Sequence, residues 1–456
     1  MKVFKPFLAI FLTTAAVSAW ASDALQTVVK QRVDGDRSGV CLVATQIGES
    51  IDHAAACAND ANDRQLGADS RFEIGSLSKA MQGLVVAGLV EAGKLELDLP
   101  LSDIYPADTE LPGSDDNPIR LIHLLTHTSG LPRLPANLAP ADVANPYADY
   151  SGSDLMEALA NTSTSTQPGE TFAYSNFGAM ALSHALMTHT GQPLHVLFDT
   201  YVLDPLEMGE TSLGGETVQG HDSAGKAVAN WDFAYNLGGV GAIRSTPADI
   251  AKWLSATLNP RGSSIEGALN RSREELINAG GQRVGYGWLH LPLNDRFILA
   301  HDGGTGGFSS FAAVDIEREA ASLVLMDTSM LMQNSLSDLA MHLIEPEFPL
   351  GQPQVPQAAA AGETLSDYVG RFAMFQGEQQ FMGDFMIDFS EQSGELLLQA
   401  SVNGQTQPQV PMTSEGDGRF TIESLDVTVE FSREGDGPVN SLDFSQGPLS
   451  LRGERL

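Results

Sequence analysis

One stretch of the chain, Met81–Val90, carries no charged side chain and only one polar side chain, and it constrains the fold more than any other segment. Its apolar residues would lie on every side of a helix, and a helix that is apolar all round is buried inside a protein. The tetrapeptide Ser76-Leu77-Ser78-Lys79 comes just before this stretch. The sequence therefore predicts a buried helix that has a hydroxyl and an amine at its entrance.

The spacing of Ser76 and Lys79 suits nucleophilic catalysis. Residues three apart on a helix have Cβ atoms about 5–6 Å apart, so the amine can take the serine proton before the hydroxyl attacks a carbonyl. Burial disfavours the ammonium form, which makes Lys79 a better base. If Ser76 lies in the first helical turn, its backbone N–H has no partner in the helix and can face an oxyanion. A second copy of the pattern, Ser223 to Lys226, has no apolar helix after it and is interpreted as a loop.

The composition excludes several classes of partner. The 456 residues include 58 acidic and 25 basic ones, which gives a net charge of −33. Such a chain would be repelled by nucleic acid phosphates and by anionic lipid headgroups, so we expect neither partner. The sequence has no H-E-x-x-H pattern and no Cys/His cluster, so we expect no metal ion and no cofactor.

Residues 1–21 look like an export signal. Two lysines near the start precede an apolar stretch, residues 7–17, and Ala19-Trp20-Ala21 is a cleavage pattern before Ser22. The apolar stretch is too short to span a bilayer comfortably. We therefore expect a periplasmic or secreted protein without a stable membrane anchor.

The two cysteines of the chain are Cys41 and Cys57. Residues 40–46 and 51–58 are predicted to be strands of one hairpin, and the cysteines are equidistant from Glu49 at its centre. An oxidising compartment favours disulfides, so we hypothesise a cross-strand disulfide. The alternative is a pair of free buried thiols.

The order of elements predicts an α+β fold. Helices are expected between a few N-terminal strands and a run of strands near residues 286–326, which indicates an antiparallel sheet with helices packed against it. One helix start is explicit: Thr246 as N-cap, Pro247 at the first position and Asp249 in the first turn.

A change of composition divides the chain. We predict a first domain at residues 22–350 and a linker rich in proline, glutamine and alanine at residues 351–362. Residues 363–456 consist of short β-like runs separated by turns, which predicts a small antiparallel barrel or sandwich.

Two further motifs follow the first in order, Tyr174-Ser175-Asn176 and His301-Asp302-Gly303. This succession resembles the penicillin-binding protein and class C β-lactamase superfamily. Thr305–Phe308 is similar to class C enzymes, and His123–Pro132 is similar to the related esterases and D-peptidases. The resemblance covers roughly Val40 to Leu343. It implies a β-lactamase/transpeptidase-like fold with a helical subdomain, and the C-terminal part resembles lipocalin-like appendages of some members.

The resemblance implies roles for the matching residues. Ser76 would attack a carbonyl and form an acyl-enzyme. Lys79 and Tyr174 would share removal and return of the proton, and either could be the base. Asn176 would hydrogen-bond the substrate's amide and Lys79. The N–H groups of Ser76 and Gly304 would hold the oxyanion.

The third motif departs from the family's commonest form, Lys-Thr-Gly. His301 replaces a permanent cation, and histidine is charged only part of the time near neutral pH. Asp302 replaces a hydroxyl that helps to hold a substrate carboxylate, and like charges repel. Alternatively, Asp302 turns away and pairs with a cation, as the alternation of a strand allows. Gly303 and Gly304 lack side chains and would let the substrate backbone come close to the strand.

We therefore expect an exported serine hydrolase that cleaves an amide or ester in a small molecule or peptide, such as a D-alanyl peptide, a β-lactam or an ester. The alternatives are a carboxylesterase of the same superfamily and a penicillin-binding sensor that is acylated without turnover. His123 and His127 are predicted to brace the loop after their helix. Arg244 is predicted to form a surface salt bridge, and the alternative is that it reaches the substrate.

Overall fold

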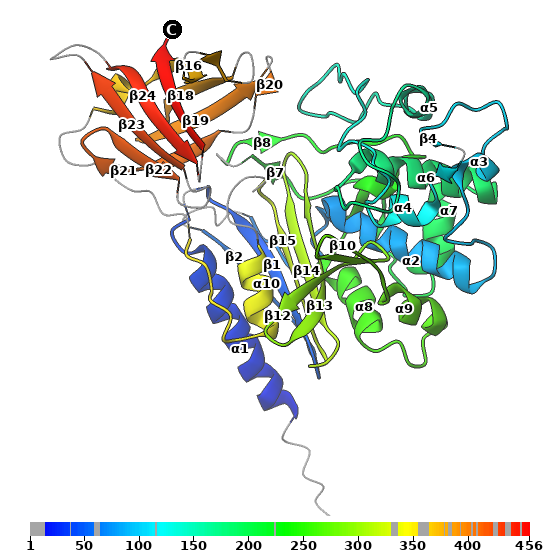
Figure 1. The fold of residues 1–456 in the computed structure, drawn as a ribbon. Coiled ribbons are helices and arrows are strands. Elements are labelled where there is room, and N and C mark those ends of the chain that lie inside the picture. The colour runs from blue at the N-terminus through cyan, green and yellow to red at the C-terminus, as the bar shows by residue number, and fades with distance from the viewer. Residues whose placement is uncertain are drawn as a thin grey trace, which may run out of the picture. The chain divides into compact units, whose positions relative to one another are not determined.

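The structure is a computed structural model. It describes residues 14–36, 38–58, 64–114, 116–222, 225–329, 336–353, 364–377, 379–381, 385–392, 394–402, 405–406, 409–422, 427–433, 439–446 and 449–456. The chain divides into two compact units, a larger one that ends at Pro353 and a smaller one made mainly of Gln354–Leu456 (Figure 1). The division falls inside the predicted linker, of which residues 354–362 lie outside the described part.

An antiparallel sheet is the centre of the larger unit. Among the described residues it has eight strands, in the order β10-β11-β12-β13-β14-β15-β1-β2. Their bounds are β10 (Glu275–Ala279), β11 (Gln282–Gly285), β12 (Leu289–Leu293), β13 (Arg296–Gly304), β14 (Ser309–Asp315), β15 (Ala320–Met326), β1 (Cys41–Ile47) and β2 (Ile51–Cys57). All of β14 and nearly all of β15 are buried. The middle of the sheet is therefore covered on both faces.

Helices cover the two faces of this sheet. Helices α1 (Thr14–Val33) and α10 (Ser337–Ile344) lie on one side and α8 (Pro247–Leu258) on the other (Figure 1). In α1, Leu25, Val29 and Val33 are buried and follow one another at intervals of four, so they form one apolar helix face. Helix α1 also runs through the predicted cleavage point, and residues 1–13 lie outside the described part, so the export signal stays a prediction.

The predicted buried helix is confirmed as α2 (Ser78–Glu91), in which every residue from Ser78 to Leu89 is buried. Around it lie α9 (Glu266–Ser272), α7 (Leu194–Phe198) and the π-helical turn η2 (Asp199–Leu203). One detail of the prediction was wrong. Ser76 is not in the α-helix but in the 3₁₀ turn η1 (Gly75–Leu77) that leads directly into it.

A layer of shorter helices completes the helical subdomain. Helix α6 (Asn176–Thr190) is its longest member, and it contacts α7 and three further short helices. The three are α3 (Leu101–Ile104), α4 (Leu121–Leu125) and α5 (Gly152–Ala160). The fold is therefore the expected α+β arrangement of a sheet, covering helices and a helical subdomain.

The smaller unit is a closed antiparallel barrel. Among its described residues, eight strands follow one another around the ring, and the last pairs with the first, with Phe372 opposite Arg455. They are β16 (Gly370–Gln376), β18 (Met386–Gln392), β19 (Glu395–Val402), β21 (Val410–Gly416), β22 (Arg419–Ile422), β23 (Val427–Arg433), β24 (Val439–Gln446) and β25 (Leu449–Arg455). Of the two predicted forms, barrel or sandwich, the structure has the barrel.

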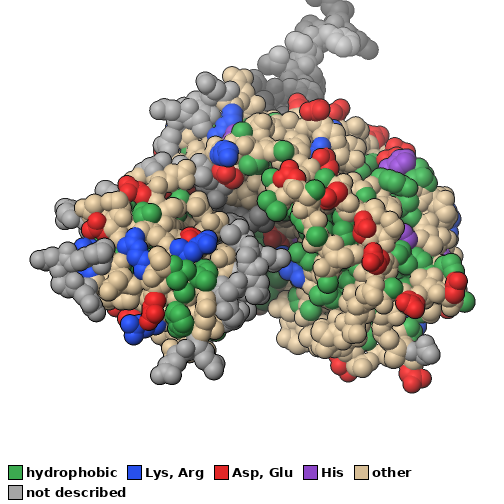
Figure 2. Space-filling model, turned by 90° about the horizontal axis from the view of Figure 1, so that it is seen from above, with side chains coloured by type: hydrophobic (Ala, Val, Ile, Leu, Met, Phe, Trp, Pro, Cys, Tyr) green, Lys and Arg blue, Asp and Glu red, His purple; other side chains and the backbone are tan. Residues whose placement is uncertain are grey.

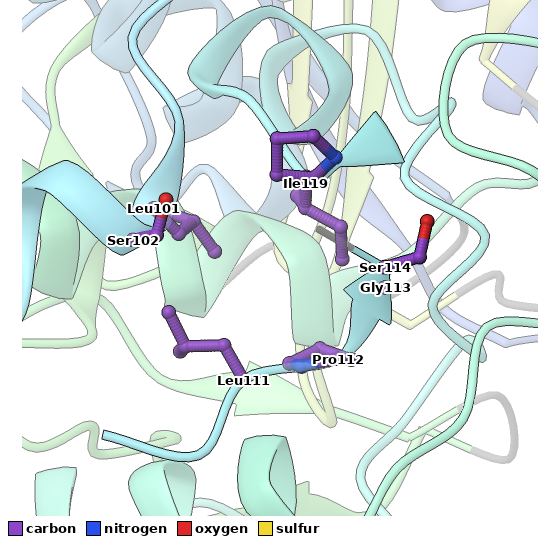
Figure 3. Close-up of a pocket in the computed structure, with 8 residues that line it drawn as sticks. Leu101, Ser102, Leu111, Pro112, Gly113, Ser114 and Ile119 are labelled. Carbon is purple, nitrogen blue, oxygen red and sulfur yellow. The ribbon is translucent and has the colours of Figure 1, made fainter. Parts of the chain in front are cut away.

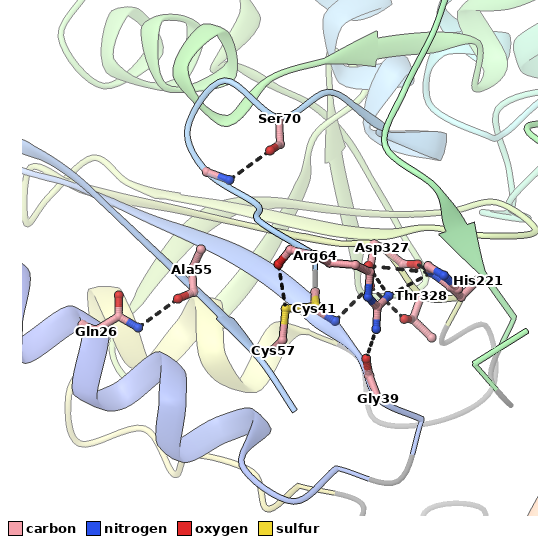
Figure 4. The surroundings of a disulfide bond; sticks show 11 residues. Gln26, Gly39, Cys41, Ala55, Cys57, Arg64, Ser70, His221, Asp327 and Thr328 are labelled. Carbon is pink, nitrogen blue, oxygen red and sulfur yellow. Dashed lines mark hydrogen bonds and ion pairs between the residues drawn. A yellow bond between two sulfur atoms is a disulfide. The ribbon is translucent and has the colours of Figure 1, made fainter. Parts of the chain in front are cut away.

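The cysteines lie opposite each other in the hairpin of β1 and β2 and are joined by a disulfide (Figure 4). Beside them, the fully buried Asp327 accepts a hydrogen bond from the backbone N–H of Cys41 at 2.9 Å and pairs with Arg64. Burial raises the pKa of Asp327, and the bond from Cys41 and the Arg64 charge oppose that shift. These contacts connect the hairpin at the sheet edge to the loop after β15.

The acidic residues do not gather at one place on the face of the larger unit that Figure 2 shows; they are scattered across it. On this face, the negative charge therefore indicates no single binding site. Across the part of the chain that the structure describes, no helix combines the length and the apolar character needed to cross a membrane.

Candidate active site

Ser76 and Lys79 are in direct contact at the entrance of α2. The Lys79 Nζ atom donates hydrogen bonds to Ser76 Oγ at 2.8 Å and to the carbonyl oxygen of Val240 at 2.7 Å. Val240 ends the 3₁₀ turn η3 (Gly238–Val240), which packs against both α2 and α6. When the amine is neutral, its bond to Val240 leaves a lone pair that can face the serine hydroxyl.

Burial sets the protonation state of Lys79, which is only 4% exposed. Desolvation lowers the pKa of its ammonium group from the ordinary lysine value to about 7, while the Asp302 charge acts in the opposite direction and the Arg133 charge adds to the lowering. A large share of the molecules therefore have a free amine at neutral pH, which is what a general base requires.

The Tyr174 ring lies beside the first motif: its centre is 5.1 Å from Lys79 Nζ, and its hydroxyl interacts with the Ser76 side chain. Burial raises the pKa of the Tyr174 phenol well above its ordinary value, and the interaction with Ser76 opposes that shift only in part. The phenol therefore keeps its proton at neutral pH. The structure thus brings the first two motifs together, with a largely free amine and a protonated phenol close to the serine.

His127 supports this phenol from behind. Its ring centre lies 4.3 Å from that of Tyr174, and its Nδ1 accepts a hydrogen bond from the backbone N–H of Ser175 at 3.2 Å. Burial lowers the pKa of His127 far below its ordinary value, and the nearby charge of Lys79 adds to the effect. His127 is therefore a neutral brace for the Tyr174 segment. His123 accepts a bond from the Arg120 N–H at the start of α4. Both histidines therefore have the expected structural role, but His123 braces the start of the helix and not the loop after it.

Asn176 begins helix α6, where the Ser175 side chain caps the helix by accepting a bond from the Gly178 N–H. The Asn176 Nδ2 donates to the Tyr147 hydroxyl at 3.3 Å. Its Oδ1 atom is buried and has no hydrogen-bond partner among the described residues, so the expected hydrogen bond between Asn176 and Lys79 is not made; Lys79 bonds Ser76 and Val240 instead. An unpaired buried acceptor is costly, so this oxygen is available to a donor that a substrate brings.

Tyr147 was not predicted as a site residue. It lies in the loop of residues 135–151, a stretch rich in proline, alanine and asparagine, and yet its side chain is buried. Its ring stacks on Phe233 at 4.8 Å between centres and meets Trp231 edge-on at 5.6 Å. This aromatic group holds the hydroxyl that contacts Asn176.

Strand β13 carries the third motif. His301 is buried, and burial lowers its pKa below the ordinary histidine value, with Asp302 opposing the shift and Lys79 adding to it. The His301 ring is therefore neutral at neutral pH. Asp302 points to solvent and has no ion-pair partner among the described residues, so the predicted pairing with a cation is not found. Its carboxylate nevertheless influences the pKa values of Lys79 and Tyr174.

The backbone of Gly303 and Gly304 lies directly against the segment that leads to Ser76. A Cβ atom on Gly303 would come within 2.1 Å of the Ile74 carbonyl oxygen and 2.9 Å of the Ser76 nitrogen. Gly75 has a φ of +52°, and a Cβ there would be 2.5 Å from the Gly304 nitrogen. Only glycine allows this approach, which places the backbone of both predicted oxyanion donors in one place.

The prediction for Arg244 was wrong. Its side chain is buried, and its Nη2 lies 3.2 Å from both Glu73 Oε1 and Asp232 Oδ1. It also donates to the carbonyl oxygen of Trp231 at 2.9 Å. Arg244 therefore holds the Trp231 segment in place and is not a surface ion pair.

A pocket outside this site lies between α3 and the hairpin of β4 (Gly113–Ser114) and β5 (Asn117–Pro118) (Figure 3). Its lining residues are apolar or carry hydroxyls, with no amine, carboxylate or imidazole, so it offers no acid–base chemistry. Ser223, the serine of the second Ser-x-x-Lys copy, lies outside the described residues. Within the described part, no group of three His, Cys, Asp or Glu side chains is placed to hold a metal ion.

The chain is similar to known proteins over most of its length. A family model described as beta-lactamase matches residues 25–338. The chain is 26% identical to the D-alanyl-D-alanine-carboxypeptidase/endopeptidase AmpH of Escherichia coli (strain K12), over 67% of this chain and 85% of that protein. It is 24% identical to Penicillin-binding protein 4* of Bacillus subtilis (strain 168), over 93% of this chain and 96% of that protein.

Solved structures show the same fold. The chain is similar to a beta-lactamase/D-alanine carboxypeptidase from Yersinia pestis complexed with citrate, with a TM-score of 0.62 and 23% identity, over 73% of this chain and 99% of that one. A beta-lactamase/D-alanine carboxypeptidase from Pseudomonas syringae gives a TM-score of 0.61 at 15% identity.

Proposed function

This chain belongs to the beta-lactamase family, a family of serine hydrolases, and on that premise we propose that it is an exported hydrolase that cleaves an amide or ester through an acyl-enzyme on Ser76. The observation that carries the proposal is the 2.8 Å contact between Lys79 Nζ and Ser76 Oγ. Burial brings the pKa of that amine to about 7, so the contact joins a nucleophile to a base in its active form.

The proposed reaction follows from the protonation states. The Lys79 amine takes the proton from Ser76 while Oγ attacks the substrate carbonyl, and the N–H groups of Ser76 and Gly304 bind the developing oxyanion. Tyr174, which holds its proton, gives it to the leaving amine or alcohol as the acyl bond breaks, and the Lys79 ammonium returns a proton to the phenolate. In the second half, water attacks the acyl group and releases the acid. Lys79 rather than Tyr174 is the base in this scheme, because the raised pKa of the phenol opposes its ionisation.

The proposed substrates are D-alanyl peptides or β-lactams, the classes named for relatives. A carboxylesterase is the second candidate, and the third motif favours it. His301 is neutral and Asp302 is an exposed anion, so this strand offers no permanent cation for a substrate carboxylate. The third candidate, a penicillin-binding sensor without turnover, is an outcome of the test below.

The test compares one preparation with a fluorescent penicillin, a chromogenic cephalosporin, a D-alanyl-D-alanine peptide and a neutral nitrophenyl ester. Ester turnover without penicillin labelling supports the esterase, and labelling without any turnover supports the sensor. Ser76→Ala should abolish every activity. Ser223→Ala, the same change in the second Ser-x-x-Lys copy, should leave them unchanged. Activity that survives in Ser76→Ala contradicts the proposal.

Export is part of the proposal and rests on the pattern of residues 1–21. N-terminal sequencing of the protein recovered from the periplasm or medium should begin at Ser22. A mature protein that still begins at Met1 contradicts export by this signal.

A further inference from the structure

Arg133 lies beside the active site but has no role in the reaction described above. Its carbonyl oxygen accepts hydrogen bonds from the backbone N–H groups of Asn176 at 2.9 Å and Phe177 at 3.2 Å. Its guanidinium carbon lies 5.3 Å from the centre of the Tyr174 ring. The backbone of Arg133 thus fixes its position next to Asn176, while its side chain lies against the catalytic tyrosine.

The guanidinium group carries an uncompensated charge. Arg133 is exposed, and it has no carboxylate within ion-pair distance among the residues that the structure describes. By contrast, many other arginines of the larger unit are paired, including Arg32, Arg64, Arg244 and Arg296. The charge acts on the site, because it contributes to the pKa values of Lys79, His127, Tyr147 and Tyr174.

A group of opposite charge lies nearby on strand β13. Asp302 on β13 is also exposed and also unpaired among the described residues. It raises the pKa of Lys79, whereas Arg133 lowers it. The reacting serine therefore has a cation on the side of Asn176 and an anion on the side of the strand, so a charged substrate has a preferred orientation.

From this arrangement we propose that Arg133 is a specificity residue that binds a carboxylate carried on the acyl part of the substrate, the part that lies along Asn176. This inference rests on the proposed function. The substrate class is an acyl donor with a free carboxylate at its far end, as in an acidic peptide side chain. A guanidinium group suits this task because it can donate two parallel hydrogen bonds to one carboxylate.

The experiment uses two nitrophenyl esters with the same leaving group. One is nitrophenyl hydrogen adipate, whose acyl chain ends in a carboxylate, and the other is its methyl ester, which is uncharged. The measured quantity is the ratio of their kcat/KM values. An exposed ion pair contributes up to about 1 kcal/mol, so we expect the full-length protein to prefer the charged ester about fivefold. The preference should appear mainly in KM and should weaken at high salt.

Arg133→Gln should bring the ratio close to one. Its effect on the pKa of Lys79 acts on both esters alike and cancels in the ratio. Arg133→Lys should keep part of the preference, and Arg133→Glu should reverse it. Arg261→Gln removes the same charge at another exposed arginine and should change nothing. If the ratio is unchanged in Arg133→Gln, this inference is overturned, while the proposed function still stands. An equal loss on both esters in that variant also overturns it, since it would show a positioning role. If the unaltered protein hydrolyses neither ester, the ester activity of the proposed function fails and the inference falls with it.

Discussion

The larger unit and the barrel differ most in what they bury. Among the described residues, the larger unit buries many polar and charged side chains, and several of them, including Lys79, His127 and His301, surround Ser76. In the barrel, the only buried polar residue in the described part is Ser401. Its charged pairs are on the surface, as in Arg371 with Asp388, whose side chains are 55% and 27% exposed.

The difference separates what stability requires from what chemistry requires. Burying a charge costs free energy, and a fold that needs only to be stable avoids it. The barrel follows this rule with a core of apolar and aromatic side chains. The larger unit buries charges in several places, such as Asp327 beside the disulfide. Around Ser76 it gathers titratable groups with perturbed pKa values, and such a gathering indicates a functional site. If the buried polar groups of the larger unit serve chemistry, changes at these groups should affect activity or stability far more than matched changes at exposed residues.

The largest expected effect is the loss of the base. Lys79→Met should lower kcat/KM by about 10²–10⁴-fold, because general base catalysis contributes that much. Lys226→Met, the same change in the second Ser-x-x-Lys copy, should leave the rate unchanged. Steady-state kinetics on the neutral nitrophenyl ester measures both. Equal rates for the two variants would contradict the link between buried charge and chemistry.

The two classes of ion pair should differ in stability. Arg244→Met removes the buried partner of Glu73 and should destabilise the larger unit by about 3–5 kcal/mol, because an uncompensated buried carboxylate remains. Arg371→Met makes the same change at an exposed pair and should cost less than about 1 kcal/mol. Calorimetry, which can resolve the unfolding of two units, measures both. Similar losses of unfolding free energy in the two variants would contradict the proposed difference between the buried pair of the larger unit and the exposed pair of the barrel.

The pH dependence should report Lys79 itself. Burial lowers the pKa of its amine to about 7, and only the free amine can accept the serine proton. On a neutral ester, kcat/KM should therefore be constant above pH 7 and fall about tenfold per pH unit well below it. A flat profile between pH 5 and 9 would assign the base to another group.

The smallest effect concerns the support of Asn176. Tyr147→Phe removes the hydroxyl that Asn176 Nδ2 contacts and should lower kcat/KM about three- to tenfold, the range of one hydrogen bond. Tyr150→Phe is the control, since its hydroxyl bonds Asn137 at 2.9 Å in the same loop. If both variants behave alike, the aromatic group does not act through Asn176.

Short sequence signals at the start of a helix were enough to predict that helix. Thr246 caps α8 by accepting a bond from the Asp249 N–H at 3.2 Å, with Pro247 at the first position, as predicted. The buried helix after Lys79 is confirmed for the same reason, because an apolar run without charges has one stable environment. Ser76, Lys79 and Tyr174 were found through short patterns, and the structure brings them together.

Such short patterns did not predict contacts between residues that are far apart in the sequence. Tyr147 meets Trp231 and Phe233 across more than eighty residues, and nothing in its own loop indicates burial. Arg244 was assigned to the surface because its partner Glu73 lies far away in the sequence and is brought beside it by the pairing of β3 (Phe72–Glu73) with β9 (Ile243–Ser245). The unpaired charge of Arg133 likewise depends on which acids the fold leaves out of reach. These features depend on the tertiary structure, so the sequence patterns alone do not reveal them.

The burial of helix α2 limits its local motion. Since it is buried from Ser78 to Leu89, it has no water-facing side on which to loosen while the rest stays folded. Fraying at Lys79, the proposed base, would require the surrounding unit to open cooperatively. Amide hydrogens in this helix should consequently exchange with deuterium as slowly as those at the middle of the sheet, which would make the proposed reacting centre one of the most rigid parts of the molecule.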